Sequence, residues 1–151
     1  MDGRASAVEM RVRVARAADA GALAELCTQL GYPSTTAELE QRLERLMGEP
    51  DHVVYVAEVP GYGVAGFLHA SSGMALETGP RAEILGLVAD ATLRGRGIGR
   101  TLVAEAERWA REKGYTALHV RCNVVRNEAH AFYEGLGFAR VKTQTNFRKE
   151  L

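Results

Sequence analysis

The sequence contains few residues of the kinds that cross-link a fold. Cysteine occurs only twice in 151 residues, as Cys27 and Cys122, and no C-x-x-C pair is present. A disulfide framework and a cysteine-based structural zinc site are therefore not expected. Because His52, His69 and His130 show no metal-ligand spacing, the sequence predicts no bound metal.

The sequence also lacks an excess of charge of either sign. Lysine and arginine together number 19, as do aspartate and glutamate, which argues against a general nucleic-acid or membrane-surface role. No apolar run approaches the roughly 18 residues needed to cross a bilayer. The N-terminus, MDGRASAVEM, has no apolar signal region. We therefore expect a cytoplasmic protein that binds neither nucleic acid nor membrane.

The length and the composition are those of an ordinary globular domain. Apolar residues make up 46% of the chain and charged residues 25%. A chain of this length can bury a core without cross-links. Since we find no repeat and no linker, we expect one domain over residues 9–151, preceded by a loose N-terminus at residues 1–8.

Hydrophobic periodicity divides the chain into strand-like and helix-like segments. Asp19 and the capping box Thr35-x-x-Glu38 indicate two helix starts, and a long apolar stripe indicates a third helix from about 98 to 113. Residues 71–80 are predicted to form a loop. The resulting order is βααβββαβαββ. The predicted strands cover residues 10–16, 52–59, 64–71, 81–90 and 115–122, with two more in 137–151, and Asn127 is predicted to open the last helix.

An unusual stretch, RGRGIGR at 94–100, lies between an apolar strand and a helix. Glycine allows close approach of the backbone to a ligand, because it has no Cβ. A helix N-terminus supplies unpaired N–H groups and partial positive charge. Together with three arginines, these features predict a site for a phosphate group.

Two common nucleotide-binding patterns do not match this stretch. The pattern G-x-G-x-x-G fails because Arg100 and Leu102 stand where its last glycine is required. The pattern G-x-x-x-x-G-K-[ST] fails because Arg94 stands where its first glycine is required. The pattern that does fit is Arg94-x-x-Gly97-x-Gly99.

This pattern belongs to a longer resemblance. Residues 82–115, AEILGLVADATLRGRGIGRTLVAEAERWAREKGY, and residues 123–138, NVVRNEAHAFYEGLGF, resemble two blocks of the GNAT superfamily of acetyl-CoA-dependent N-acetyltransferases. The order of elements is similar from about residue 10 onward. The resemblance implies an α+β fold with a mixed, mostly antiparallel sheet of about seven strands flanked by four helices.

The resemblance also implies acetyl-CoA as co-substrate. Backbone N–H groups of residues 95–100 would hold its pyrophosphate, and an open strand edge at residues 87–89 would pair with the pantetheine amides. Asn127 would contact the pantetheine arm, and Tyr133 would lie near the sulfur. The implied cofactor-binding residues are Leu87, Val88, Ala89, Arg94, Gly95, Arg96, Gly97, Ile98, Gly99, Arg100, Asn127 and Tyr133.

Acetyl transfer to an amine needs a neutral nucleophile and an acid for the leaving thiolate. An alkylamine with a pKa of about 10.4 requires about 4.6 kcal/mol to be neutral at pH 7. Tyr133 is the candidate general acid, and Glu83 on the apolar strand is the candidate base, acting through water. A backbone N–H near Val88 would stabilise the oxyanion.

Structural roles are the alternatives for each of these residues. The loop glycines could form only a tight turn, and Tyr133 shares a helix face with Phe132 and Leu136, as a core aromatic would. Asn127 could serve only as a helix cap. Glu83 could be an exposed strand residue.

The sequence indicates the acceptor only broadly. In the superfamily, the acceptor site commonly lies between the first two helices and the loop before the central strand, here 29–43 and 71–80. Tyr32, Glu77 and Glu83 could line a pocket for a cationic amine. The second block resembles that of the aminoglycoside-type branch, which favours a small-molecule amine.

Two other functions stay open at this point. The chain could be a non-catalytic acetyl-CoA-binding sensor or interaction module, because the cofactor motif alone supports binding. It could also acetylate protein N-termini or lysines, which are acceptors elsewhere in the superfamily. Homodimers are common in the superfamily, so a homodimer is a further expectation.

Overall fold

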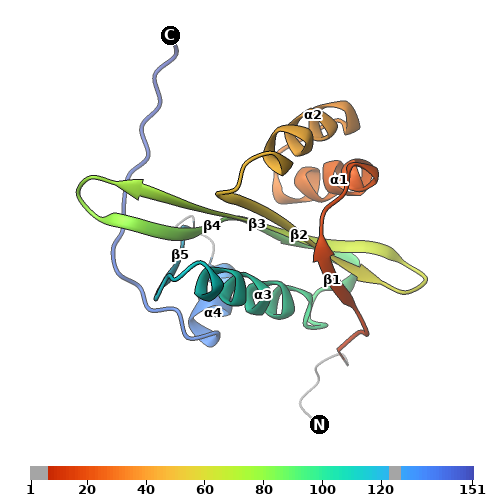
Figure 1. Ribbon diagram of the computed structural model, residues 1–151. Helices are drawn as coiled ribbons and strands as arrows, with labels where there is room; N and C mark the ends of the chain where they lie inside the picture. The colour runs from red at the N-terminus through yellow and green to blue at the C-terminus, as the bar shows by residue number, and fades with distance from the viewer. Residues whose placement is uncertain (1–6, 123–126) are drawn as a thin grey trace. The chain divides into compact units, whose positions relative to one another are not determined.

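The computed structural model describes residues 7–122 and 127–151. The chain divides into two compact units, Met1–Val120 and Arg121–Leu151, and each is considered by itself. The first unit contains a sheet and three α-helices, and the second contains one α-helix and the C-terminal segment (Figure 1). The single domain over residues 9–151 stays a prediction.

Five described strands form one sheet in the first unit, in the order β1-β2-β3-β4-β5. Strands β1 to β4 are antiparallel to their neighbours, and β5 runs parallel to β4. The predicted α+β class with a mostly antiparallel sheet is thereby confirmed. The strands are β1 (Arg11–Val14), β2 (His52–Val59), β3 (Gly63–Ala75), β4 (Gly79–Ala89) and β5 (Leu118–Val120).

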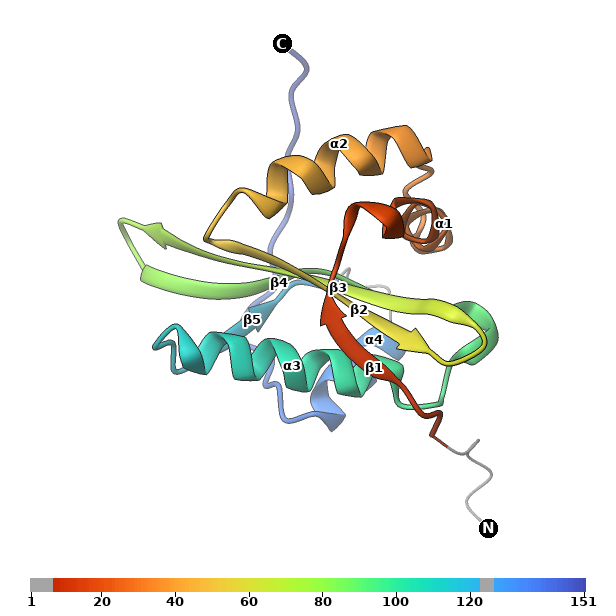
Figure 2. The same cartoon turned by 45° about the vertical axis from the view of Figure 1, so that its right-hand side comes forward.

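Helices cover both faces of this sheet. Figures 1 and 2 show α1 (Ala20–Leu30) and α2 (Thr36–Met47) on one face and α3 (Ile98–Glu112) on the other. Short 3-10 turns lie at Ala17–Asp19 and Ala91–Leu93. None of the described helices is long and apolar enough to cross a membrane.

Each face of the sheet buries its own set of apolar side chains. The core under α1 and α2 includes Leu23, Leu39, Val56, Phe67 and Val88. The apolar stripe predicted for the third helix is confirmed, because its members are the buried residues of α3. These are Ile98, Leu102, Val103, Ala106, Trp109 and Ala110.

The first two α-helices differ in how their N-termini are capped. The predicted capping box is present at α2, where Glu38 N donates to Thr35 Oγ1 and Thr35 N donates to Glu38 Oε1, both at 3.2 Å. Asp19 precedes α1 as predicted, but its side chain does not cap that helix. Its carboxylate instead accepts two hydrogen bonds from the Arg13 guanidinium and one from Arg16 N. Arg13 thereby lowers the pKa of the Asp19 carboxyl.

The loop predicted over residues 71–80 is mostly strand. Register pairs continue past Ser71↔Glu83 to Ala75↔Gly79, so β3 and β4 form a long hairpin (Figures 1 and 2). The small and polar residues of SSGMALETGP suggest a loop. Residues 71–75 nevertheless pair with residues 79–83, because the two adjacent backbones can hydrogen-bond along their whole length.

The strand count is lower than the predicted seven. The described residues contain five strands, and none lies in the two segments predicted within 137–151. In the second unit, α4 (Asn127–Gly135) begins at Asn127 as predicted. An alternation of apolar and polar residues shows only that the side chains suit a strand. A strand also needs a neighbouring backbone with which to form hydrogen bonds. The described C-terminal segment has the pattern without that pairing.

A glycine in β3 lets α3 lie close to the sheet. A Cβ added at Gly66 would be 2.7 Å from Ile98 Cγ2, 2.8 Å from the Val88 carbonyl oxygen and 3.3 Å from Leu102 Cδ1. The α3 side chains therefore occupy the space that a side chain at position 66 would fill. This contact sets the depth at which the N-terminal turn of α3 sits on the sheet.

We expect Gly66→Ala to lower the free energy of unfolding by about 1–3 kcal/mol, because the new methyl group overpacks a filled space. The measurement is urea denaturation followed by circular dichroism. Gly73→Ala is the matched control, since a Cβ at this position in the same strand meets nothing within 4 Å. Equal losses in the two variants would contradict this account of the packing.

Candidate functional site

Strand β4 departs from regular pairing halfway along its length. It pairs with β5 only from Ala82 to Ile84. A β-bulge follows directly, because Ala70 pairs with Ile84 whereas His69 pairs with Gly86, which leaves Leu85 as the extra residue. A bulge bends and twists its strand. The bend therefore coincides with the point at which pairing to β5 ends.

Beyond the bulge, one edge of β4 is open. Residues Leu87, Val88 and Ala89 pair with β3 on one side. On the other side, no strand in residues 7–122 and 127–151 pairs with them. Backbone N–H and C=O groups on such an edge can bind an extended ligand as an added strand.

The glycine-rich loop ends at the N-terminus of α3, where the first N–H groups have no helical carbonyl partner. Gly97 is the N-cap, with φ 85° and no side chain to cap the helix. The first helical hydrogen bond runs from Thr101 N to the Gly97 oxygen at 3.0 Å. The N–H groups of residues 98–100 precede it, so no helical carbonyl accepts from them. Such donors and the dipole of the helix favour a negatively charged group at this position.

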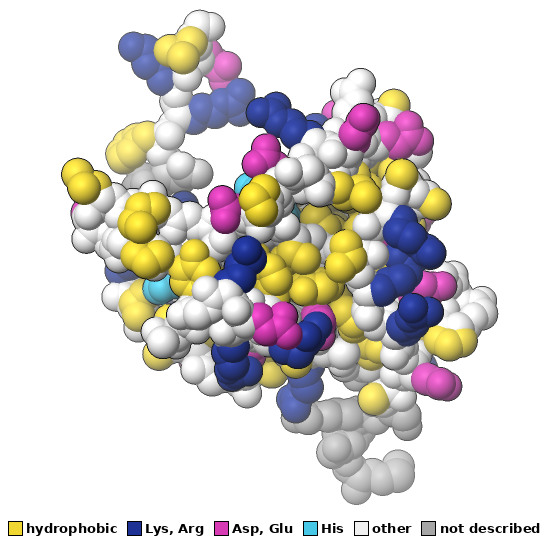
Figure 3. All heavy atoms as spheres, in the orientation of Figure 1, with side chains coloured by type: hydrophobic (Ala, Val, Ile, Leu, Met, Phe, Trp, Pro, Cys, Tyr) yellow, Lys and Arg dark blue, Asp and Glu magenta, His cyan; other side chains and the backbone are white. Residues whose placement is uncertain are grey.

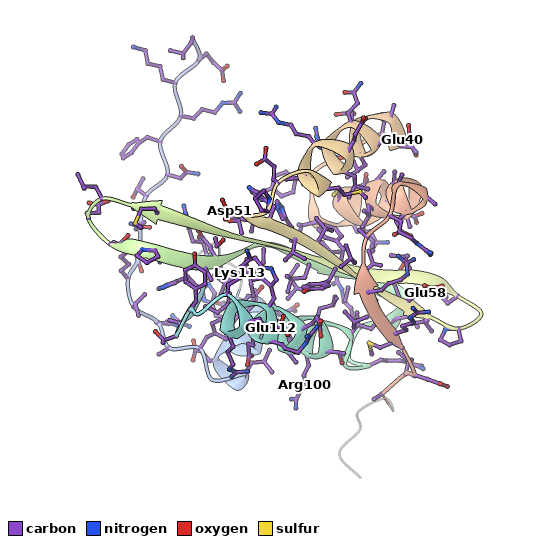
Figure 4. All side chains as sticks on the ribbon, viewed as in Figure 1. Glu40, Asp51, Glu58, Arg100, Glu112 and Lys113 are labelled. Atoms are coloured by element: carbon purple, nitrogen blue, oxygen red, sulfur yellow. The ribbon has the colours of Figure 1, made fainter. Side chains whose placement is uncertain are left out.

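Positive side chains surround this site. Arg94, Arg96 and Arg100 are exposed, and Figure 4 shows Arg100 directed away from the sheet. Elsewhere on the face of Figure 1, positive and negative side chains are interspersed, as Figure 3 shows. The three loop arginines are therefore a local concentration of charge in a chain with no net charge.

A buried carboxylate anchors the turn between β4 and the loop. Asp90 accepts hydrogen bonds from Thr92 N at 2.9 Å, Thr92 Oγ1 at 2.8 Å and the Tyr62 hydroxyl at 2.9 Å. Ala91 N donates to Gln29 Oε1 at 3.0 Å. Burial raises the pKa of the Asp90 carboxyl, but these hydrogen bonds outweigh it and hold the pKa below its usual value. The turn is thus tied to α1 and to the β2–β3 hairpin.

The segment before β1 also contacts the loop. Val8 N donates to the Arg96 carbonyl oxygen at 3.2 Å, and a Cβ at Gly97 would lie 3.8 Å from that of Ala7. The N-terminal residues that the structure describes therefore help to hold the loop backbone. Residues 1–6, in the stretch predicted to be loose, lie outside the described residues.

Glu83 lies in a polar row that crosses the sheet. Register pairs join His52 to Ser71, Ser71 to Glu83 and Glu83 to His119. Paired residues point to the same face. Because His52 is two residues before Val54, which packs on the core under α1 and α2, the row lies on that face.

Further polar groups extend this row. His52 Nδ1 and His69 Nε2 are 2.9 Å apart, and Arg81 Nη2 donates to His119 Nδ1 at 2.8 Å. Burial, followed by the charge of His52, lowers the pKa of His69 to about 4, so His69 is neutral at pH 7. The described residues contain no group of three acidic, histidine or cysteine side chains that could hold a metal ion.

The other predicted site residues belong to other elements of the chain. Asn127 and Tyr133 belong to α4 in the second unit, where the Tyr133 ring contacts Phe132 at 5.1 Å and Phe138 at 5.5 Å between centroids. Tyr32 is exposed just after α1, and Glu77 is exposed in the β3–β4 turn. The structure thus brings together Leu87–Ala89 and residues 94–100 within the first unit.

Comparison with known proteins identifies the family. The model described as the Acetyltransferase (GNAT) family matches residues 20–138. The chain belongs to the GNAT family. It is therefore an acyltransferase, and its α+β fold is the GNAT fold.

Individual relatives agree with this membership. The chain is 28% identical over 144 residues to an aminoglycoside N(6')-acetyltransferase type 1 of Stenotrophomonas maltophilia, covering 93% of each. It is 29% identical over 119 residues to the uncharacterized N-acetyltransferase YjgM of Escherichia coli strain K12, covering 77% of this chain and 68% of the relative. The structure of aminoglycoside N-acetyltransferase AAC(6')-Iy in complex with CoA has a TM-score of 0.84 at 20% identity, covering 100% of both chains.

Several residues of this GNAT site were not predicted from the sequence. Asp90-x-Thr92 is a capping pattern, so this part of the anchor was available as a local signal. Tyr62 and Gln29 have no such signal, because they lie 28 and 62 residues from their partners. Gly66 was also missed, since its role depends on a helix that begins 32 residues later in the chain.

We expect Gly97→Val to weaken CoA binding at least about tenfold, because a β-branched residue is strained at this φ and displaces the loop donors. Calorimetric titration with CoA is the measurement. Gly114→Val is the matched control, since Gly114 has φ 89° at the other end of the same helix. If Gly97→Val binds CoA as tightly as the control, the loop does not hold the ligand.

Proposed function

We propose that this GNAT protein transfers the acetyl group of acetyl-CoA directly to a primary amine of a small molecule. The observation that supports the proposal is that an open strand edge is followed closely by a glycine-rich loop at a helix N-terminus. The open edge at Leu87–Ala89 ends just before the loop at 94–100, which leads to the N-terminal N–H donors of α3. One extended ligand with amides along its arm and a pyrophosphate at its end fits both features.

The relatives support the choice of cofactor and acceptor class. One solved relative is in complex with CoA, and one relative matched along nearly its whole length is named as an aminoglycoside acetyltransferase. Aminoglycosides are small-molecule amines, and we propose an acceptor of that broad class. The homodimer and the cytoplasmic location expected from the sequence stay predictions.

The reaction requires one new bond and one broken bond. The amine nitrogen attacks the thioester carbonyl carbon, and the C–S bond breaks to release CoA thiolate. We propose that the Val88 N–H donates to the oxygen that gains charge during this step. The amine proton passes through water to Glu83, and Tyr133 donates its hydroxyl proton to the thiolate. The products are an amide and CoA.

Mutation of Tyr133 tests the function and the acid together. We expect the wild-type protein to release CoA thiol with some primary amines, and Tyr133→Phe to lower kcat about 100-fold or more while binding acetyl-CoA normally. Tyr115→Phe is the matched control. The measurement is a thiol-release assay over a panel of amines and lysine peptides, with calorimetry for binding.

Three results would contradict this function in different ways. Acetyl-CoA binding without thiol release from any acceptor would indicate a non-catalytic module. Release with peptides alone would indicate a protein acetyltransferase. An unchanged kcat in Tyr133→Phe would exclude Tyr133 as the general acid.

Glu83→Gln tests the base. We expect kcat/KM to fall and the low-pH limb of its profile to disappear, because the amide cannot ionise or accept a proton. The measurement is the pH dependence of kcat/KM for the best amine. Glu44→Gln, on the exposed face of α2, is the control and should keep the wild-type profile. A profile in Glu83→Gln that keeps its low-pH limb would exclude Glu83.

A further inference from the structure

One arginine on the sheet has a buried donor without a partner. Arg81 lies on β4 opposite Gly73, two residues before Glu83. Its Nε is buried and has no hydrogen-bond partner among the described residues. Its Nη2 donates to His119 Nδ1 at 2.8 Å. A guanidinium only donates, so the lone pair of His119 Nδ1 accepts this hydrogen bond.

The same fold satisfies another largely buried arginine fully. Arg13 donates from Nε to Glu58 and from both terminal nitrogens to Asp19. Buried polar groups are normally paired in this way, because an unpaired donor loses its hydration without compensation. Arg81 departs from that pattern, since the described salt bridges include none to Arg81. A buried donor without a partner requires an explanation, and a guanidinium binds carboxylate and phosphate groups strongly.

Arg81 and Glu83 occupy the same face of the sheet. Residues two apart on a strand point the same way, at a separation of about 6.6 Å. His52, His69 and His119 lie near this row on the same face. Among these five described side chains, Glu83 is the one carboxylate, so the row itself has no acidic excess. A polycationic acceptor would need such an excess, whereas an acceptor with its own acid group would not.

We propose that Arg81 binds an oxyanion group of the acceptor, so that the substrate is a primary amine that also carries a carboxylate or a phosphate. The proposal rests on the function proposed above, in which Glu83 marks the acceptor side of the site. The planar Arg81 guanidinium matches either oxyanion through two parallel hydrogen bonds. Arg81 lies two residues from Glu83 on β4. One small molecule could therefore place its acid group at Arg81 and its amine at Glu83.

A binding experiment tests the site without catalysis. Inorganic phosphate is titrated at constant ionic strength while the His119 imidazole is followed by NMR. We expect a saturable shift of His119 in the wild-type protein and none in Arg81→Gln. Binding of phosphate at the glycine loop is separated by the amide signals of Gly95, Gly97 and Gly99. Equal His119 shifts in both proteins, or none in either, would overturn the proposal.

Acetylation of matched amines tests the same site in turnover. The pairs are 4-aminobutyrate with butylamine and glucosamine 6-phosphate with glucosamine, which separate carboxylate from phosphate. We expect kcat/KM to favour the acid-bearing member of at least one pair by about tenfold or more. Arg81→Gln should lose that preference and Arg81→Lys should keep part of it. Arg111→Gln is the matched control, because the Arg111 side chain is exposed on α3. This variant should keep the full preference for the acid-bearing amine.

The two experiments fail in distinguishable ways. If no amine of either pair or of the wider panel is acetylated, the proposed function fails, and the phosphate titration still reports on Arg81. If amines are acetylated but the neutral member of each pair is preferred, the anion site is wrong and the acetyltransferase function stands. A preference that is unchanged in Arg81→Gln also overturns the assignment.

Discussion

The contact between Ile98 and Gly66 determines how the N-terminus of α3 lies relative to the end of β4. Ile98 is the first residue of α3 and is 1% exposed, and it fits against β3 only because Gly66 has no side chain. The helix N-terminus is thereby held next to the end of β4. The helix donors therefore follow shortly after the edge of β4 that we propose pairs with the ligand. Without this close approach, a helix dipole and a strand edge would be two separate features.

The anchor around Asp90 completes that arrangement from the other side. The turn after β4 has few apolar side chains to hold it, and three of its residues are exposed. Tyr62 donates a hydrogen bond to Asp90, and Ala91 N donates to Gln29. These bonds hold the turn to the β2–β3 hairpin and to α1. The two ends of the glycine loop are held by side chains, one by buried Ile98 and the other by Asp90.

The face of the sheet under α1 and α2 has two chemically different parts. Val56, Phe67 and Val88 form an apolar part that packs on the helices. His52, Ser71, Glu83 and His119 form a polar row further along the same strands. Side chains two residues apart share a face along β2 and β3, and the extra residue Leu85 brings Glu83 and Val88 of β4 to that same face. One β-sheet therefore carries both an apolar core and a polar row.

The sequence by itself determined the elements whose signals are local. The capping box at Thr35, the apolar stripe of α3 and the glycine-rich start of that helix each depend on residues within a few positions, and each was predicted. Tertiary structure alone decided the bulge at Leu85, the long β3–β4 hairpin, the partners of Asp90 and the unpaired donor of Arg81. Tertiary structure also decided that the described residues 137–151 form no strand, although their sequence pattern predicts two. These features depend on which backbone or side chain arrives from a distant part of the chain, and no short pattern carries that information.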